Sequence, residues 1–278
     1  MIVHPASLEN GRTLWRIAGE PGDRVLPRDS LWVNGLLRSI PASLEALWLA
    51  LVLGPFARRL VVPGSIDEAL AGSLGALVGT PIAGDVRRAD TGIHSGVYGA
   101  TLVRDSFDDY LAARVPNPST FPVAVEHELE GTTRGFRVVA NAGTFRRYLE
   151  PLDRVGELAA LAMASPVLGI QDITAFLCRE ELAGLDVELL IAVMRTAGVR
   201  LDLPLAQASV RELGILAKEH PSPTVAFGAL YVRYRMFPAV MVEIYEGLKA
   251  GLVAGDGKPI PVRIAEYLAR GIPQPGMG

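Results

Sequence analysis

Glycine-spaced polar residues between positions 85 and 100 include the side chains of this sequence that are best suited to acid–base chemistry. An imidazole titrates near neutral pH, so we expect His94 to be the general acid or base of a catalytic site. Asp90 would orient that imidazole, and Tyr98 would act as a hydrogen-bond donor. The segment therefore predicts an active site built around His94.

The same segment offers groups that would hold a substrate. Arg87 and Arg88 would bind a carboxylate or phosphate, because guanidinium groups form paired hydrogen bonds with such anions. Ser95 is expected to join them in substrate binding. The interspersed glycines would let the backbone approach a ligand closely. The alternative interpretation is an exposed surface loop whose charges pair locally.

A second cluster is the run Glu126-His127-Glu128. On a strand, both carboxylates would point to one side and the imidazole to the other, so the three side chains cannot share one site without a bulge. The carboxylates would form an acid–base pair or a metal site, or else a solvated face balanced by Arg137.

A third cluster combines helix-spaced aromatic and basic residues with acidic residues on the next expected helix. Its members are Tyr231, Arg233, Tyr234, Arg235, Glu243, Tyr245 and Glu246. Such a combination is typical either of a recognition surface or of the core of a helical bundle.

Signatures of several common enzyme classes are missing from the sequence. The chain has no Walker A pattern, no dinucleotide-binding G-x-G-x-x-G, no G-x-S-x-G and no H-E-x-x-H. A single cysteine, Cys178, excludes an internal disulfide and any multi-cysteine metal site. We therefore expect no metal centre, and the sequence identifies no cofactor.

Composition narrows the partners and the compartment. The 278 residues are 50% hydrophobic and carry a formal net charge of −3, without a basic arm, so we expect no nucleic-acid partner. The most apolar run, 46–57, is too short to span a bilayer, and the first residues do not resemble a signal peptide, so we expect no membrane association. The low cysteine content favours a reducing, cytoplasmic location, and arginine far outnumbers lysine, as in GC-rich bacterial genomes.

The first half of the chain predicts an α/β or α+β fold with a mixed sheet. Short strands are expected near 13–18, 31–33, 60–62 and 81–83, with helices over 41–53 and from a Ser65–Glu68 capping box to about 78. This alternation indicates parallel pairing through crossover helices. Alternation over 121–142, with one mainly apolar and one mainly polar face, predicts an antiparallel β-hairpin that turns at 131–135.

The second half of the chain predicts only helices. They are expected near 145–163, 170–183, 186–197, 204–219, 223–235, 238–251 and 260–270. The expected domains are an α/β domain at 1–143 and a helical domain at 144–278, or one continuous body with a cleft between the halves.

These observations lead to two functional hypotheses. The first is a bacterial enzyme of biosynthetic type that acts on a small, anionic molecule by acid–base chemistry. The second is a non-catalytic binding or assembly protein that uses its helical half as an interface, as a homo-oligomer or with a protein partner.

Overall fold

The computed structural model describes residues 1–34, 40–86, 96–103, 120–126 and 136–222, together with Val225, Gly228, Ala229 and Val232. The chain divides into two compact units. The first comprises Met1–Ala175 and Glu181–Asp202, and the second comprises Phe176–Glu180 and Leu203–Gly278. Two sheets and the helices that cover them belong to the first unit.

The first sheet is mixed, as the sequence predicts. Its strands are β1 (Ile2–Val3), β2 (Ser7–Glu9), β3 (Arg12–Ala18), β4 (Ser30–Asn34), β5 (Leu60–Ile66) and β6 (Ile82–Val86). The order is β2-β3-β1-β5-β6, with β4 also paired to β3. Strands β1, β5 and β6 run parallel, whereas β3 is antiparallel to each of its neighbours. The four strands expected in this region are therefore confirmed.

The second sheet is parallel in every pairing that the structure describes. Its strands are β7 (Tyr98–Val103), β8 (Thr120–Glu126), β9 (Phe136–Val139), β10 (Ile170–Ala175) and β11 (Arg200–Asp202). The spatial order is β11-β10-β7-β8-β9.

The antiparallel hairpin predicted over 121–142 is wrong. Both of its strands exist, but β8 and β9 are parallel, with Val123 opposite Phe136 and Glu126 opposite Val139. Alternation of apolar and polar residues reports which face of a strand is buried, and it carries no information on strand direction. The expected turn at 131–135 lies outside the described residues.

The helix predicted over 170–183 is also wrong. Residues Ile170–Ala175 form β10, and a short 3-10 helix, η2 (Arg179–Leu182), follows them. With β11 at 200–202, residues 144–222 are not all helical. Six residues are too few for periodicity alone to separate a strand from a helical turn. The helices predicted beyond 236 lie outside the described residues.

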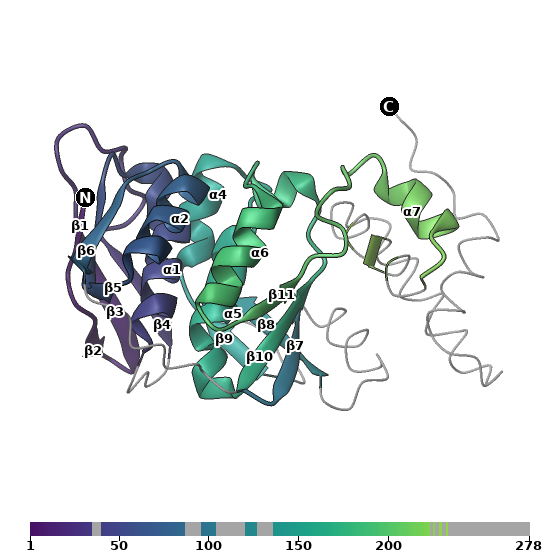
Figure 1. Ribbon diagram of the computed structural model, residues 1–278, viewed down its shortest axis with the longest axis horizontal. Coiled ribbons are helices and arrows are strands. Elements are labelled where there is room, and N and C mark those ends of the chain that lie inside the picture. Colours follow the sequence, from purple (N-terminus) through teal and green to yellow (C-terminus); the bar gives the residue numbers. More distant parts are fainter. Residues whose placement is uncertain are drawn as a thin grey trace. The chain divides into compact units, whose positions relative to one another are not determined.

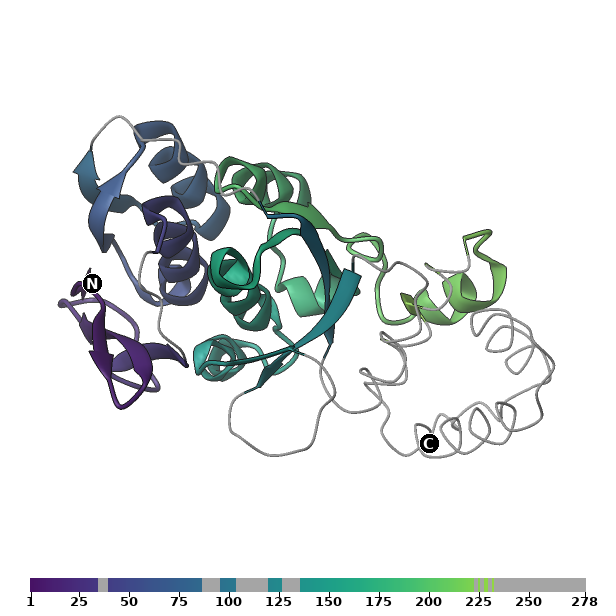
Figure 2. The ribbon, with the colours of Figure 1, turned by 90° about the horizontal axis from the view of Figure 1, so that it is seen from below.

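Helices fill the space between the two sheets (Figure 1, Figure 2). In the first unit they are α1 (Ala42–Leu53), α2 (Glu68–Val78), α4 (Ala142–Leu149), α5 (Val155–Leu168) and α6 (Val187–Thr196), with a 3-10 turn, η1 (Gly54–Phe56). Helix α1 packs on β5 and α2 on β6, while α5 packs on β10 and α6 on β11. Because α1 also packs against α5, the unit has a sheet–helix–helix–sheet arrangement.

Helix α1 lies at the centre of this core. From Ala46 to Leu53 every side chain is buried, which confirms a helix that is apolar almost all round. Helix α2 is capped differently from the prediction. Asp67, and not Ser65, is its N-cap, because the Asp67 carboxylate accepts from the backbone N–H groups of Ala69 and Leu70.

Polar contacts join the two sheets. The Asn141 side chain accepts from the Trp32 backbone N–H at 2.8 Å and donates to the Ser30 carbonyl at 2.9 Å, which links the end of β9 to β4. Arg146 donates to the Leu51 carbonyl at 3.2 Å, from α4 to α1. In the second unit, α7 (Leu213–Glu219) follows a capping contact between Ser209 and Glu212.

Within the described ranges, no helix has both the length and the apolar character needed to cross a bilayer.

Candidate functional site

Among the six predicted site residues, Tyr98 lies in the described ranges. Tyr98 is the first residue of β7, and its side chain is about half exposed. Its ring lies beside Gly169, because a Cβ atom added to Gly169 would be 3.3 Å from the Tyr98 Cδ2 atom. The other five, Arg87, Arg88, Asp90, His94 and Ser95, lie outside the described residues, and their roles stay predictions.

The two other clusters lie mostly outside the described ranges as well. Glu126 is the last residue of β8, and the residues that follow it, His127 and Glu128, are not described. None of the residues of the third cluster, from Tyr231 to Glu246, is described either. The roles expected of both clusters stay predictions.

The structure confirms that the predicted site segment follows a strand. That strand is β6, which ends at Val86 and lies at the parallel edge of the first sheet. Ligands of α/β proteins are often bound where parallel strands end, so the carboxyl end of β6 is where the site is best sought.

Strand β5 carries a bulge beside this end of β6. The register runs from Val61 opposite Ala83 to Ser65 opposite Asp85, so three residues of β5 face the single residue Gly84. The bulge consists of Val62-Pro63-Gly64. Bulges are concentrated next to active sites, where they redirect a strand and free backbone groups from the ladder.

Glycine is needed on both strands at this bulge. Gly64 has a φ of +79°, a conformation that side-chain-bearing residues rarely adopt. A Cβ on Gly84 would lie 3.3 Å from the Gly64 carbonyl oxygen and 3.1 Å from Cγ2 of Ile66. Both glycines therefore allow the bulge to form with the two backbones closely packed.

Glu45 on α1 brings a carboxyl group to the bulge. One oxygen, Oε1, accepts a 2.7 Å hydrogen bond from the Trp15 indole N–H, and the other, Oε2, lies 3.9 Å from the Cβ position of Gly64. Helix α1 holds Glu45 there because its apolar residues pack on β5, while Trp15 of β3 is fixed in the core against Trp48.

Burial raises the pKa of Glu45 above its ordinary value, and the weaker effect of the Trp15 hydrogen bond opposes the rise. No charged group contributes to this shift, so Glu45 has no neutralising cation among the residues that the structure describes. A carboxyl group whose pKa is moved towards neutral pH can both donate and accept a proton, which is the requirement for general acid–base catalysis.

Glu45 is not among the site residues predicted from the sequence. The helix over 41–53 is predicted as a buried structural element, and a first-turn acid is common there because it favours the helix dipole. A signal is nevertheless present: Glu45 is the sole charged residue in the twelve-residue helix ASLEALWLALVL. A lone acid in an otherwise apolar helix must be paired or must change its pKa.

The carboxyl end of β6 lies close to Glu45. Val86 pairs with Ile66, two residues beyond Gly64. Two residues along a strand and one strand spacing place Val86 within about 10 Å of Gly64. The chain therefore enters the predicted segment from a point near the Glu45 carboxyl group.

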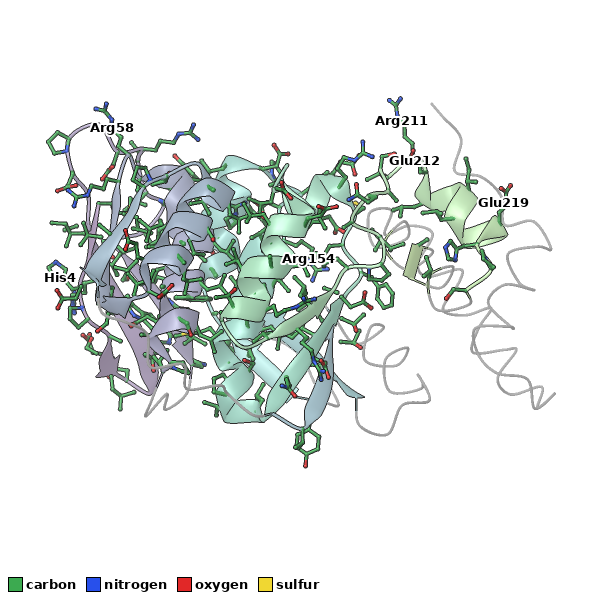
Figure 3. All side chains as sticks on the ribbon, viewed as in Figure 1. His4, Arg58, Arg154, Arg211, Glu212 and Glu219 are labelled. Carbon is green, nitrogen blue, oxygen red and sulfur yellow. The ribbon has the colours of Figure 1, made fainter. Side chains whose placement is uncertain are left out.

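A separate set of charges is buried around the start of α5. Arg146 pairs with Asp153 at 2.7 Å, and both Arg147 and Arg154 pair with Glu157. Burial alone would raise the pKa of Glu157, but the two arginines hold it below its ordinary value. Figure 3 shows Arg154 inside the body, whereas His4 and Arg58 extend from its outer edge. Because these charges are paired with one another, they form a structural joint between α4 and α5.

No group of three or more potential metal ligands occurs among the described residues. Comparisons with protein-family models, curated proteins and solved structures find no match.

Proposed function

We propose that this protein is an acid–base enzyme that acts on a small anionic molecule at the β5 bulge, with Glu45 as a proton carrier. The observation that carries the proposal is the Glu45 carboxyl group: it is partly buried, has no cation beside it in the described ranges, and is held by Trp15 next to the interrupted ladder. The raised pKa brings this carboxyl group closer to the range in which it can both donate and accept a proton.

The anionic character of the substrate rests on sequence. Arg87 and Arg88 come directly after the last residue of β6, and guanidinium groups suit carboxylates and phosphates. His94 follows seven residues after Arg87. An imidazole and a carboxyl group with a raised pKa would form an acid–base pair whose members titrate in different environments.

Proton NMR in D2O tests the proposal on a defined set of small anions: pyruvate, oxaloacetate, 2-oxoglutarate and phosphoenolpyruvate. An acid–base enzyme should convert one of them or exchange one of its C–H protons for deuterium. Glu45→Gln keeps an oxygen for Trp15 but cannot carry the proton, so it should reduce the rate by about 10²-fold or more without lowering the melting temperature below that of the wild type.

Glu188→Gln is the matched control, because Glu188 is an exposed acid in the first turn of α6. It should leave the rate unchanged. His94→Ala tests the predicted segment by the same assay. Wild-type turnover that persists in Glu45→Gln would refute the role of Glu45, and the absence of conversion and exchange for the whole set would refute the proposed substrate class.

A second candidate function is assembly. Val97, Tyr98 and Val167 form an exposed apolar group at the amino end of the parallel sheet, where the backbone N–H of Val97 donates to the Gly169 carbonyl at 3.0 Å. Exposed apolar groups of this kind can mark protein contacts. If they do so here, sedimentation should show an oligomer that Val97→Asp and Val167→Asp dissociate; a wild-type monomer at high concentration would refute this candidate.

A further inference from the structure

The parallel sheet reverses its strand order between β7 and β10. From β7 the chain builds β8 and β9 on one side, and it then returns to add β10 and β11 on the other. In open parallel sheets, such a reversal leaves a crevice outside the carboxyl ends of the two central strands, and ligands bind there. Figure 1 shows β7 and β10 side by side in this sheet.

Three polar side chains cross this reversal in a single row. Thr174 of β10 is in register with Thr101 of β7 on one side and with Asp202 of β11 on the other. Residues in register on parallel strands point to the same face of the sheet. The opposite face is apolar and buried, and its members in the adjacent register are Ala100, Ile173 and Leu201.

None of these three side chains has a hydrogen-bond or ion-pair partner within the portion of the chain that the structure describes. Thr101 is only 9% exposed, and its hydroxyl group has no partner among the described residues. Asp202 is exposed at the end of β11, and partial desolvation raises the pKa of its carboxyl group. Thr174 is half-buried and Asp202 is exposed, so both are accessible to the ligand that would give the Thr101 hydroxyl group its missing partner.

A neighbouring basic group is already engaged. Arg200, two residues before Asp202 on the same face, forms two hydrogen bonds with Asp172, one of them 2.7 Å between Nη2 and Oδ2. Because Arg200 is paired with Asp172, it is not a free cation beside the row. The row itself offers one carboxylate and two hydroxyl groups, a set that disfavours a phosphate as the ligand. A carboxylate accepts well from two neighbouring hydroxyl groups, and threonine hydroxyl groups both donate and accept.

We propose that Thr101, Thr174 and Asp202 form a second binding site, which takes a vicinal diol such as that of a ribose or another sugar. The site lies on the second sheet and is independent of the proposed acid–base site on the first. The row spans two strand spacings, about 10 Å, which accommodates one sugar ring.

Isothermal titration calorimetry with adenosine and 2′,3′-dideoxyadenosine tests the diol directly, because the two ligands share a base and differ in the hydroxyl groups. Ribose and glucose, titrated alone, separate a nucleoside from a free sugar as the source of the diol. We expect either adenosine or one of the sugars to bind. If the nucleoside is the ligand, the dideoxy compound should bind at least about tenfold more weakly than adenosine, because it cannot form the hydrogen bond to a charged group.

Variants of the row should weaken the same interaction. Asp202→Asn and Thr174→Val keep the shape of each side chain and should each lower the affinity about tenfold. The matched controls are Asp29→Asn, an exposed aspartate beside β4, and Thr196→Val, whose hydroxyl group donates within α6 to Ala192. Both controls should bind like the wild type.

Three results would overturn the proposal: equal binding of adenosine and its dideoxy analogue without binding of either sugar, undiminished binding by Asp202→Asn, or no binding of any of these probes. Glu45→Gln should bind the diol normally. The two sites can therefore fail separately, because loss of turnover in Glu45→Gln leaves this titration unchanged.

Discussion

Glu45 combines partial burial, one hydrogen bond from Trp15 and no cation within the described ranges, and these conditions together predict a pH-dependent stability. The folded state holds the Glu45 proton more tightly than the unfolded chain does, because burial raises the pKa in the folded state above the ordinary 4.5. Glu45 thus stabilises the fold fully below about pH 4.5, and this stabilisation is lost as the pH rises through the raised pKa.

Urea unfolding of Glu45→Gln at about pH 4 and about pH 8 measures this effect. The variant should gain stability relative to the wild type at the higher pH, where the wild type must bury a charge. Glu9→Gln is a control for which the change of stability with pH should have the opposite sign, because Ser7 and Arg16 lower the pKa of Glu9 in the folded state. If the free energies of unfolding of Glu45→Gln and the wild type differed by the same amount at both pH values, this expectation would be contradicted.

The ion pair of Arg146 and Asp153 is almost completely buried, with side chains 4% and 2% exposed. Removing one partner leaves the other charge in the core, so Asp153→Asn and Arg146→Met should each cost about 3–5 kcal/mol in the free energy of unfolding. The double variant should cost less than the two single variants together. A double-mutant cycle checks this, and single variants within about 1 kcal/mol of the wild type would show that the pair is hydrated.

Helices α4 and α5 approach so closely that only glycine fits at one position. A Cβ on Gly156 would lie 2.6 Å from the Ala142 carbonyl oxygen, which is backbone and cannot rotate away. Gly156→Ala should therefore destabilise the protein by about 1–3 kcal/mol. Gly72, in α2, has no atom within 4 Å of its Cβ position, so Gly72→Ala should stabilise by about 0.5–1 kcal/mol.

Thermal unfolding of these two helix variants measures the difference. Both replace glycine by alanine within a helix, so helix propensity favours alanine in both variants. If Gly72→Ala stabilises the protein and Gly156→Ala destabilises it, the difference is due to the close approach of α4 and α5. A stabilising Gly156→Ala would show that the two helices can separate without cost.

Elements are predicted correctly from the sequence where a local signal is strong, and wrongly where the outcome depends on distant partners. Pro41 and Gly54 bound an apolar segment, and α1 lies where expected. The α6 helix after Asp186 is confirmed for the same reason. In contrast, nothing local specifies that β8 and β9 run parallel, or that the six residues of β10 pair on both sides with other strands. Glu45 was missed because its significance depends on Trp15 and Gly64, which are distant in sequence.

The two sheets of the first unit should unfold together as one cooperative body. Helix α1 contacts β5 and α5, Arg146 of α4 bonds to α1, and Asn141 ties β9 to β4. Loosening one sheet therefore exposes helices that the other sheet needs for its core.

Two probes report on the sheets separately. All three tryptophans lie in β3, β4 or α1, so fluorescence follows the first sheet, while hydrogen exchange of the β10 amides follows the second. We expect both to give the same free energy of opening. An earlier fluorescence transition, with β10 still protected, would show that the sheets unfold independently.

The rings of Trp15 and Trp48 lie 6.0 Å apart at an angle of 50°. Two indoles this near and this tilted couple their electronic transitions, so the pair should give a paired positive and negative band in the ultraviolet circular dichroism spectrum. Since Trp15 also bonds to Glu45, a molecule that displaces this carboxyl group would change the coupling. The protein therefore contains its own spectroscopic reporter of events at the β5 bulge, and no added label is required.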